Sequence, residues 1–322
     1  MRIVYFGTAS FAVQPLKALL ADRTRFEVVA VVSQPDKPAG RDGAVSSSPV
    51  AKAAREAGVT LLQPSKMKTD ETREMLASLN ADLFVVAAYG RIIPRALLDL
   101  PKNGALNLHG SLLPKYRGAS PIQAAIAAGD TETGVTLMGM DEEVDHGPTY
   151  ATARVTIEAT DTYATLEAKM ADAGSELLIA KIDDVISGAL PAVEQHHSEA
   201  SFTGIIDRRD GFVNWSADDA AAIECRRRAF TPWPGLYAIW MRNGIPLRIK
   251  LLDVAITGTS TGAIPGTAFK TVDGFPAIAA RSGALKLLLV QPEGKKPMEG
   301  KILLNGYQDF IGSILQNEEA SS

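Results

Sequence analysis

The first half of the chain alternates between short apolar runs, which have the composition of buried strands, and longer segments with helical periodicity. The strand-like runs cover residues 2–7, 26–33, 81–90, 104–110, 133–141 and 149–157, and the helical segments cover residues 10–22, 48–58, 69–80, 120–130 and 161–188. Runs that are apolar on both faces and alternate with helices indicate a mostly parallel sheet with helices on both sides. We therefore predict a doubly wound α/β domain.

The pattern changes in the last third of the chain, where strand-like runs are separated by turn-rich segments. These runs cover residues 235–241, 246–256 and 284–292, and a helical segment covers residues 216–230 before them. This spacing is typical of a small β-barrel, and residues 189–204 have the low periodicity of a connector. We predict a first domain over residues 1–189, a linker over 190–207 and a second, smaller β-barrel domain over 208–318.

Composition is that of an ordinary globular protein, with 322 residues of which 46% are hydrophobic and 22% charged. The single cysteine, Cys225, excludes an internal disulfide and suits a reducing compartment. The apolar run at the N-terminus is too short for a signal peptide, and no stretch approaches the roughly 18 apolar residues of a membrane helix. We expect a cytoplasmic protein with no membrane partner.

Charge is unevenly distributed along the chain. The net charge is −4, but residues 208–322 alone carry a net charge of +3. A basic C-terminal part points weakly to a ligand that bears phosphate groups. An uneven spread of surface charge without function explains the same numbers equally well.

Asn107 and His109 stand near the end of the strand-like run 104–110. In open α/β sheets, ligands bind beyond the carboxyl ends of the strands. Two residues apart on an extended strand, the two side chains face the same way. An amide and an imidazole that project together could polarise a carbonyl and move a proton. From these residues alone, a histidine satisfied within the core remains an alternative.

The acidic segment GMDEEVDHG ends the strand-like run 133–141 and supplies carboxylates that could complete an acid–base pair with the imidazole. Its acidic residues lack the spacing of a calcium loop, and no Cys/His pair has zinc spacing, so we predict no metal. Ser111 lacks the G-x-S-x-G context of a hydrolase nucleophile, and FGTAS is not a dinucleotide fingerprint.

The segment NLHGSLLPKYRGASPIQAAIAAGDTETGVTLMGMDEEVDHG closely resembles the core of the folate-dependent formyltransferases, and the likeness runs from Met1 to about Phe310. The segments FTPWPGLY and LLLVQPEGKKPMEG resemble members of the family that act on a tRNA. The resemblance implies a Rossmann-like domain and a small OB-like barrel that helps to hold tRNA. It also implies that 10-formyltetrahydrofolate donates its formyl group to the amino group of methionine on initiator methionyl-tRNA.

Carried over residue by residue, the family's catalytic set falls on Asn107, His109 and Asp145. Asn107 and protonated His109 would hydrogen-bond the formyl oxygen, and Asp145 would orient His109 or relay the proton of the amine. The expected contacts of the folate are Ser111, Leu112, Leu113, Pro114, Val86, Tyr89, Gly90 and Asp141.

Cationic residues are the expected contacts of the tRNA, and they are Arg41, Lys37, Arg227, Arg248, Lys250 and Lys295. The sequence departs from the family at two places. Asp42 to Val45 replace a usually basic stretch of the loop 34–48, and His146 follows Asp145 where a small polar residue is usual. Either change leaves the role of its neighbours open.

Three other functions remain open from the sequence. A sugar-nucleotide formyltransferase shares the NLHGSLLP-type core and the folate donor, although the second-domain motifs argue against it. A hydrolase that releases formate from the same folate would use similar residues. A folate- or RNA-binding module would need no catalysis, which the intact Asn107, His109 and Asp145 set disfavours. We expect the protein to act as a monomer.

Overall fold

The computed structural model describes residues 1–39, 44–258 and 262–318. The chain forms two compact units. The first comprises Met1–Ile122, Thr131–Ile157 and Thr165–Gly204, and the second comprises Gln123–Asp130, Glu158–Ala164 and the residues from Ile205 onward. None of the helices in the described ranges is long and apolar enough to cross a membrane.

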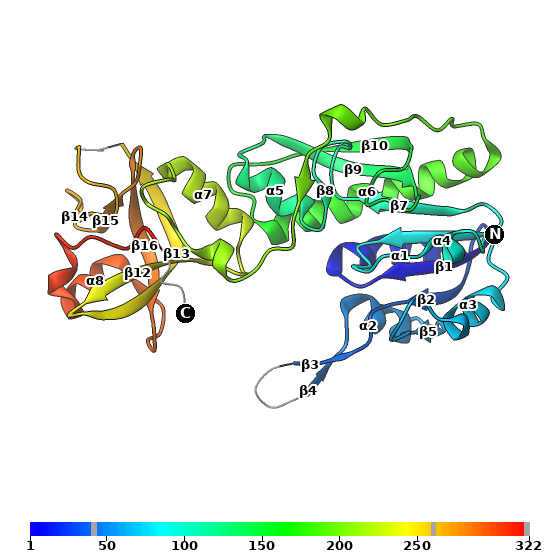
Figure 1. The fold of residues 1–322 in the computed structure, drawn as a ribbon, viewed down its shortest axis with the longest axis horizontal. Helices are drawn as coiled ribbons and strands as arrows, with labels where there is room; N and C mark the ends of the chain where they lie inside the picture. Colours follow the sequence, from blue (N-terminus) through cyan, green and yellow to red (C-terminus); the bar gives the residue numbers. More distant parts are fainter. Residues whose placement is uncertain (40–43, 259–261, 319–322) are drawn as a thin grey trace. The chain divides into compact units, whose positions relative to one another are not determined.

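A seven-stranded sheet forms the centre of the first unit, in the order β10-β9-β7-β6-β1-β2-β5 (Figure 1). Its strands are β1 (Arg2–Gly7), β2 (Glu27–Val32), β5 (Leu61–Leu62), β6 (Leu83–Ala87), β7 (Ala105–His109), β9 (Glu132–Gly139) and β10 (Thr149–Thr156). The five strands from β7 to β5 are parallel to one another, whereas β9 and β10 are antiparallel to their neighbours. The predicted α/β class with a mostly parallel sheet is confirmed.

Helices connect these strands at the positions that the periodicity predicts, except for the one-turn helix at residues 95–98, which was not predicted. They are α1 (Val13–Ala21) with a preceding 3-10 turn η1 (Ser10–Ala12), α2 (Pro49–Glu56), α3 (Asp70–Ala77), α4 (Arg95–Leu98), α5 (Pro121–Ala127) and α6 (Tyr163–Ser187). Ser48 and Thr69 cap α2 and α3, because each side chain accepts a hydrogen bond from a backbone N–H of the first turn.

The strands at the centre of the sheet form the core. β6 and β7 are buried along their whole length, and β1 is buried from Ile3 to Gly7. Phe6 packs against Phe84 and Tyr89, with ring centroids 4.9 and 5.5 Å apart. Because these strands have no solvent-exposed face, their sequences are almost entirely apolar, and Asn107 and His109 of β7 are the exceptions.

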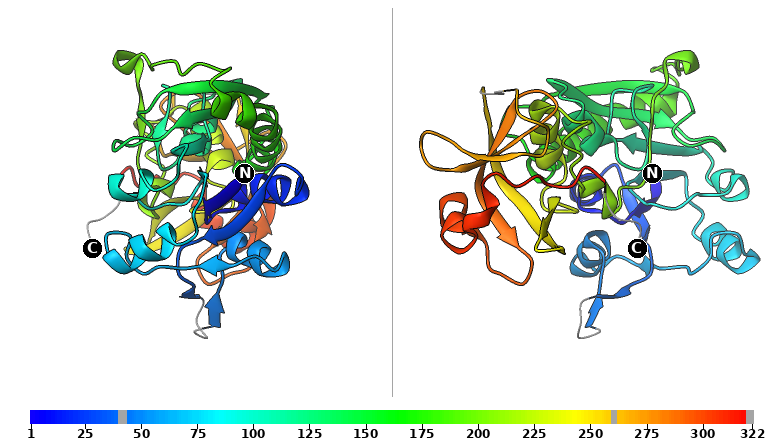
Figure 2. Two further views of the ribbon diagram at one scale, coloured as in Figure 1. Left: turned by 90° about the vertical axis from the view of Figure 1, so that its right-hand side faces the viewer. Right: turned by 60° about the vertical axis from the view of Figure 1, so that its left-hand side comes forward.

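A short hairpin follows β2, formed by β3 (Lys37–Ala39) and β4 (Ala44–Ser46). Lys37 pairs with Ser46 and Ala39 with Ala44. The hairpin extends away from the seven-stranded sheet (Figures 1 and 2). Arg41, a predicted tRNA contact, lies outside the described residues.

The second unit contains an antiparallel sheet in the order β12-β13-β16-β15-β14, with β17 paired to β16. The strands are β12 (Leu236–Arg242), β13 (Ile245–Thr257), β14 (Ala268–Lys270), β15 (Pro276–Ala279), β16 (Ala284–Pro292) and β17 (Met298–Glu299). This unit also contains η3 (Arg209–Gly211), α7 (Ala220–Ala229), α8 (Gly300–Gly306), η4 (Gln308–Phe310) and most of α5. Within the described residues no ladder joins β12 to β14, so closure into an OB-like barrel stays a prediction.

Candidate active site

Asn107 and His109 project from β7 toward the same side of the sheet. β7 lies between β6 and β9, where Asn107 is opposite Val86 on one side and Met138 on the other. Both side chains are buried, with 9% and 5% of their surface exposed. A buried amide and a buried imidazole need polar partners, and the loop after β9 provides one for both.

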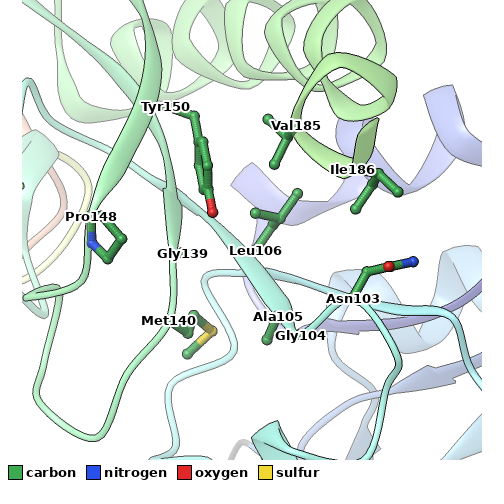
Figure 3. A pocket seen from close by; sticks show the side chains of 10 residues that line it. All are labelled: Asn103, Gly104, Ala105, Leu106, Gly139, Met140, Pro148, Tyr150, Val185 and Ile186. Carbon is green, nitrogen blue, oxygen red and sulfur yellow. The ribbon is translucent and has the colours of Figure 1, made fainter. Parts of the chain in front are cut away.

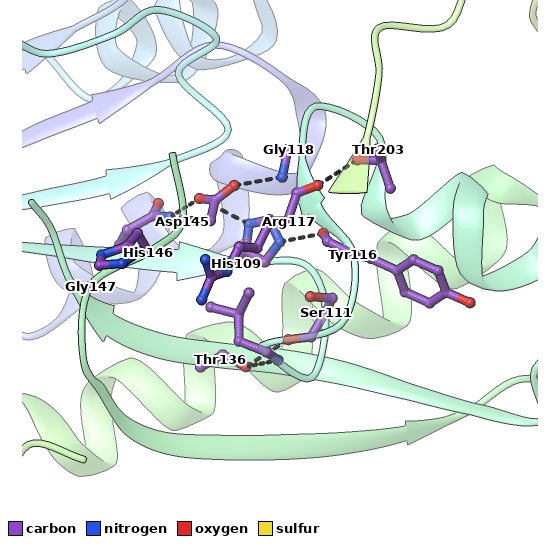
Figure 4. Close-up of polar contacts among 12 residues, drawn as sticks. His109, Ser111, Tyr116, Arg117, Gly118, Thr136, Asp145, His146, Gly147 and Thr203 are labelled. Atoms are coloured by element: carbon purple, nitrogen blue, oxygen red, sulfur yellow. Dashed lines mark hydrogen bonds and ion pairs between the residues drawn. The ribbon is translucent and has the colours of Figure 1, made fainter. Parts of the chain in front are cut away.

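Asp145 lies against both side chains, and Figure 4 shows its contact with His109. Its Oδ1 is 3.3 Å from His109 Nδ1 and accepts a hydrogen bond from Asn107 Nδ2 over 3.4 Å. Its Oδ2 accepts a hydrogen bond from the Gly118 N–H over 2.8 Å. The structure therefore brings together the three residues that the sequence singled out as a catalytic set.

Two opposing effects act on the Asp145 carboxyl. Burial raises its pKa, but the hydrogen bond and charge of His109, the Gly118 N–H and the charge of Arg117 lower it, and the net pKa lies below the usual value of an aspartate. Asp145 is consequently an ionised carboxylate at neutral pH, which can accept a proton.

Both ring nitrogens of His109 have partners. Nε2 lies 2.9 Å from the carbonyl oxygen of Tyr116, and since a carbonyl can only accept, Nε2 carries a hydrogen. Nδ1 faces Asp145. Asn107, by contrast, contacts Asp145 through a long hydrogen bond. In the described part of the chain, the Asn107 amide is thus less engaged as a donor than either ring nitrogen of His109.

The acidic loop reaches His109 by a route that the sequence did not predict. The expectation that this loop follows the carboxyl end of a parallel strand is wrong, because β9 is antiparallel to β7 and Gly139 pairs with Leu106. The N–H of Met140 donates to the carbonyl of Ala105, at the opposite end of β7. The loop then returns along β7, which brings Asp145 to Asn107 and His109.

The turn from Ser111 to Tyr116 is held by hydrogen bonds within the site. Ser111 is fully buried, and its hydroxyl donates to the carbonyl of Lys115. Thr136 Oγ1 donates to the carbonyl of Ser111 over 2.6 Å and accepts from the N–H of Leu113 over 3.1 Å. Ser111 therefore builds the turn, while Leu112, Leu113 and Pro114 are half-buried on it.

The other predicted folate contacts have different surroundings. Val86 and Tyr89 are buried, and the Tyr89 hydroxyl donates to the sulfur of Met67 within the core. Gly90 is exposed and has a φ of +75°, a conformation that favours glycine. Of the Tyr89–Gly90 segment, Gly90 is accessible, whereas Tyr89 is a core residue.

Asp141 belongs to a second pair beside the first. His146 Nδ1 lies 2.7 Å from Asp141 Oδ2, and about 30% of each side chain is exposed. The His146 ring stacks on the ring of His197, with centroids 4.0 Å apart and planes within 2°. His197 lies in the short turn η2 (His197–Glu199) of the connector, so the connector contacts the acidic loop.

The predicted linker contributes further residues that the sequence reasoning missed. β11 (Phe202–Thr203) pairs in parallel with β8 (Arg117–Gly118). Thr203 Oγ1 donates to the Arg117 carbonyl over 3.0 Å, and the N–H of Tyr116 donates to Ser201 Oγ over 2.8 Å. Strands of two residues are too short to produce periodicity, so β-propensity at Phe202 and Thr203 was the one available signal.

A cavity of about 360 Å³ lies at the other end of β7, away from His109. Leu106, Tyr150, Val185 and Ile186 surround it, together with the loop from Asn103 (Figure 3). The predicted catalytic and folate residues do not line it. Among the described residues, no group of three or more His, Cys, Asp or Glu side chains is arranged to hold a metal ion.

Three of the predicted tRNA contacts lie close together in the second unit. Arg248 and Lys250 are exposed on β13, and Lys250 pairs with Gln291, whose amide donates to the carbonyl of Lys295. Arg227 differs, because its guanidinium is 15% exposed and pairs with Glu224 at 3.0 Å. Lys37 is described here by its backbone in β3 alone.

Comparisons with known proteins bear on both units. The family model "Formyl transferase" matches residues 1–182, and "Formyl transferase, C-terminal domain" matches residues 205–308. The chain is 43% identical over 313 residues to a methionyl-tRNA formyltransferase of Myxococcus xanthus (strain DK1622), covering 97% of each chain. It is 42% identical over 298 residues to one of Roseiflexus sp. (strain RS-1), covering 92% of this chain and 90% of that protein.

Solved structures show a similar fold at lower identity. The sugar 3N-formyl transferase WlaRD, crystallised with dTDP and 5-N-formyl-THF, superposes with a TM-score of 0.62 at 19% identity and covers 92% of this chain and 99% of that one. At that identity the likeness concerns the fold alone. The family models and the relatives above 40% identity, which span nearly the whole length, establish that this chain belongs to the formyl transferase family.

Proposed function

We propose that this protein transfers the formyl group of 10-formyltetrahydrofolate to the amino group of methionine on initiator methionyl-tRNA. The observation that carries the proposal is the identity of 38 to 43% to three methionyl-tRNA formyltransferases, which extends through the second unit as well as the first. The buried Asn107, His109 and Asp145 cluster supports it, since it supplies the donor and the acceptor that formyl transfer to an amine requires.

The roles of the three side chains follow from their contacts. Attack by the amine on the formyl carbon places negative charge on the formyl oxygen, and the amide of Asn107 is the donor least engaged elsewhere to stabilise it. His109 can act as a second donor to the formyl oxygen when the N–H at Nδ1 leaves Asp145 and binds that oxygen instead. Asp145, ionised at neutral pH, accepts the proton of the attacking amine directly or through a water. As the bond between the formyl carbon and N10 of the folate breaks, that proton passes to N10, and tetrahydrofolate leaves.

The folate would lie across the ends of β6 and β7. Leu112, Leu113 and Pro114 offer a half-buried apolar wall, and Gly90 allows close approach of a ligand to the backbone. The folate would not touch the side chains of three other predicted contacts. Ser111 would hold the turn below this wall, and Val86 and Tyr89 would pack in the core below it. Asp141 would contact the pterin only at the cost of its bond to His146.

The second unit would hold the tRNA by phosphate contacts. Arg248, Lys250 and Lys295 form the cation group that the described sheet brings together, whereas Glu224 competes for Arg227. Such contacts position an RNA without reading its bases. Isolated bridges from Leu315 to Trp240 of β12 and from Ile314 to Thr267, next to β14, approach both sheet edges and support our proposal of an OB-like barrel.

We further propose that the protein acts as a monomer in the cytoplasm, where initiator tRNA is charged, and that residues 1–189, 190–207 and 208–318 serve as catalytic domain, linker and tRNA-binding domain. No metal enters this proposal, since the formyl group already has the oxidation level that transfer requires.

A transfer assay tests the proposed function. The wild-type protein is incubated with 10-formyltetrahydrofolate labelled in the formyl group and with charged initiator tRNA, an amino-sugar nucleotide, or no acceptor. We expect label on methionyl-tRNA in the first reaction alone. Label on the sugar nucleotide would indicate the alternative formyltransferase, and release of formate without acceptor would indicate a hydrolase.

A further inference from the structure

Gln195 of the connector binds the backbone of the loop that carries Asp145. Its Nε2 lies within hydrogen-bond distance of three consecutive carbonyl oxygens, those of Asp145 at 3.0 Å, His146 at 3.1 Å and Gly147 at 2.7 Å, which share the two hydrogens of the amide. Only 7% of the Gln195 surface is exposed. A buried amide shared among three carbonyls holds one particular shape of that loop.

That shape is one which the loop would not favour by itself. Asp145 has a φ of +51°, in the left-handed region that residues with a side chain adopt infrequently. At Gly147, a side chain would collide with the carbonyl of Gly139, so close approach of the backbone requires glycine there. A strained turn of this kind persists when contacts with its surroundings hold it in place. The hydrogen bonds of Gln195 to the loop are such contacts.

Arg117 fixes the orientation of the Gln195 amide. Its Nε and NH2 donate to Gln195 Oε1 over 3.2 and 2.7 Å, and its NH2 also donates to Nδ1 of His197 over 2.8 Å. A guanidinium can only donate, so Oε1 must face Arg117 and Nε2 must face the loop. The next residue, Gly118, donates to Asp145 Oδ2, so one short strand reaches Asp145 directly and through Gln195.

We propose that Gln195 is a positioning residue for Asp145, which it keeps in the left-handed conformation that aims the carboxylate at Asn107 and His109. Gln195 lies away from the reacting atoms and acts through the backbone of the loop. The consequence for turnover rests on the proposed function. The consequence for the contact between Asp145 and His109 does not.

The matched test is Gln195→Glu. Glutamate keeps the length of the side chain and an oxygen for Arg117, but it presents an acceptor to three carbonyls. A displacement of about 1 Å at a reacting group can cost roughly 10²-fold in rate, so we expect kcat for formyl transfer to fall 10- to 100-fold. KM for the folate and for the tRNA should stay within twofold, since Gln195 is buried and its amide is already bound to Arg117 and to the loop. Glu194→Gln, the reverse exchange at the exposed neighbouring position, is the control.

Two further measurements keep the proposal falsifiable. Gln195→Met removes the donor without adding a charge, and it should reproduce the loss. A loss in Gln195→Glu alone would assign the effect to the charge and overturn the proposal. In protein labelled with ¹⁵N-histidine, the ring signals of His109, assigned through His109→Ala, should change in both variants and not in Glu194→Gln.

The outcomes separate the two proposals. Wild-type rates and an unchanged His109 signal in both Gln195 variants would overturn the positioning role. Failure of the wild-type protein to formylate methionyl-tRNA would overturn the proposed function, while the His109 signals would still decide whether Gln195 positions Asp145.

Discussion

Two histidine–aspartate pairs lie in the same part of the first unit, and they differ in almost everything except residue type. His146 and Asp141 are closer, at 2.7 Å, than His109 and Asp145, at 3.3 Å. The His109–Asp145 pair is buried, however, with side-chain exposures of 6% and 14%, against 29% and 32% for the His146–Asp141 pair. The shorter distance belongs to the pair that faces solvent.

The surroundings, more than the distance, distinguish the pairs. Asp145 also accepts from Asn107 and from the Gly118 N–H, and its backbone is held by Gln195. Asp141 accepts from His146 and from the N–H of its neighbour Glu143. Electrostatic interactions strengthen where water is excluded and weaken where it is not. Burial and these additional partners are the reasons why we propose His109 and Asp145, and not His146 and Asp141, as the catalytic pair.

The largest expected effect separates the two aspartates. Asp145→Asn removes the proton acceptor, so we expect formyl transfer to fall by roughly 10²–10⁴-fold, as for the loss of a general base. Asp141→Asn, the matched change in the exposed pair, should alter the rate less than about threefold. Single-turnover rates at pH 7.5 measure both, and equal losses would abolish the distinction between the pairs.

The histidines should differ in the same direction. His109→Ala removes a donor near the formyl oxygen and the partner of Asp145, and we expect a loss of roughly 10²–10³-fold. His146→Ala removes a ring that stacks on His197 near the surface, and we expect less than about fivefold. Both rates are measured under saturating folate and tRNA, with circular dichroism as the control for folding. A rate for His146→Ala as low as that of His109→Ala would contradict the comparison.

Acid unfolding gives a smaller difference. The pKa of Asp145 is lowered in the folded protein, whereas an unfolded aspartate has a pKa of about 3.9. Its stabilising contribution is therefore complete above about pH 5 and is lost as the pH falls through the folded pKa. Urea midpoints measured from pH 6 to pH 3 should fall less steeply for Asp145→Asn than for the wild type. A decline in Asp145→Asn as steep as that of the wild type would contradict this prediction.

The smallest expected effect is the coupling within the exposed pair. Partly exposed ion pairs contribute about 0.2–1 kcal/mol. A double-mutant cycle with His146→Ala and Asp141→Asn, read from the free energy of unfolding in urea at pH 6, should give a coupling in that range. A value well above it would mean that the stack on His197 shields the pair from solvent.

Apolar runs and helical periodicity were sufficient to predict the α/β class and the main elements of the first unit, because burial on both faces leaves a clear pattern. Asn107 and His109 could be placed on one face of a strand by counting alone. The antiparallel direction of β9 was not predictable, since strand direction depends on the connections and leaves the apolar pattern unchanged. The hairpin β3–β4 and the strands β8 and β11 have two or three residues each, too few for a period.

Gln195 and Arg117 could not be found for another reason. Their contacts join positions 78 residues apart in the chain, and no local periodicity indicates either contact. A buried arginine is predicted from sequence as a surface charge, because its burial depends on partners that the fold supplies. The proposed catalytic residues could be named from local sequence and from resemblance. The residues that hold the loop of Asp145, Gln195 and Arg117, could not.

The pairing of β11 with β8 has a consequence for how this chain can be cut or lengthened. A fragment that ends at residue 189 retains Asn107, His109 and Asp145 but loses Gln195, Ser201 and Thr203, whose contacts shape the loops around them. The shortest self-sufficient catalytic fragment should therefore extend to Gly204. Inserting or deleting a residue between Gln195 and Thr203 would shift one contact relative to the other. Residues 196–202 are largely exposed, so substitutions among them should be tolerated, whereas insertions and deletions should not.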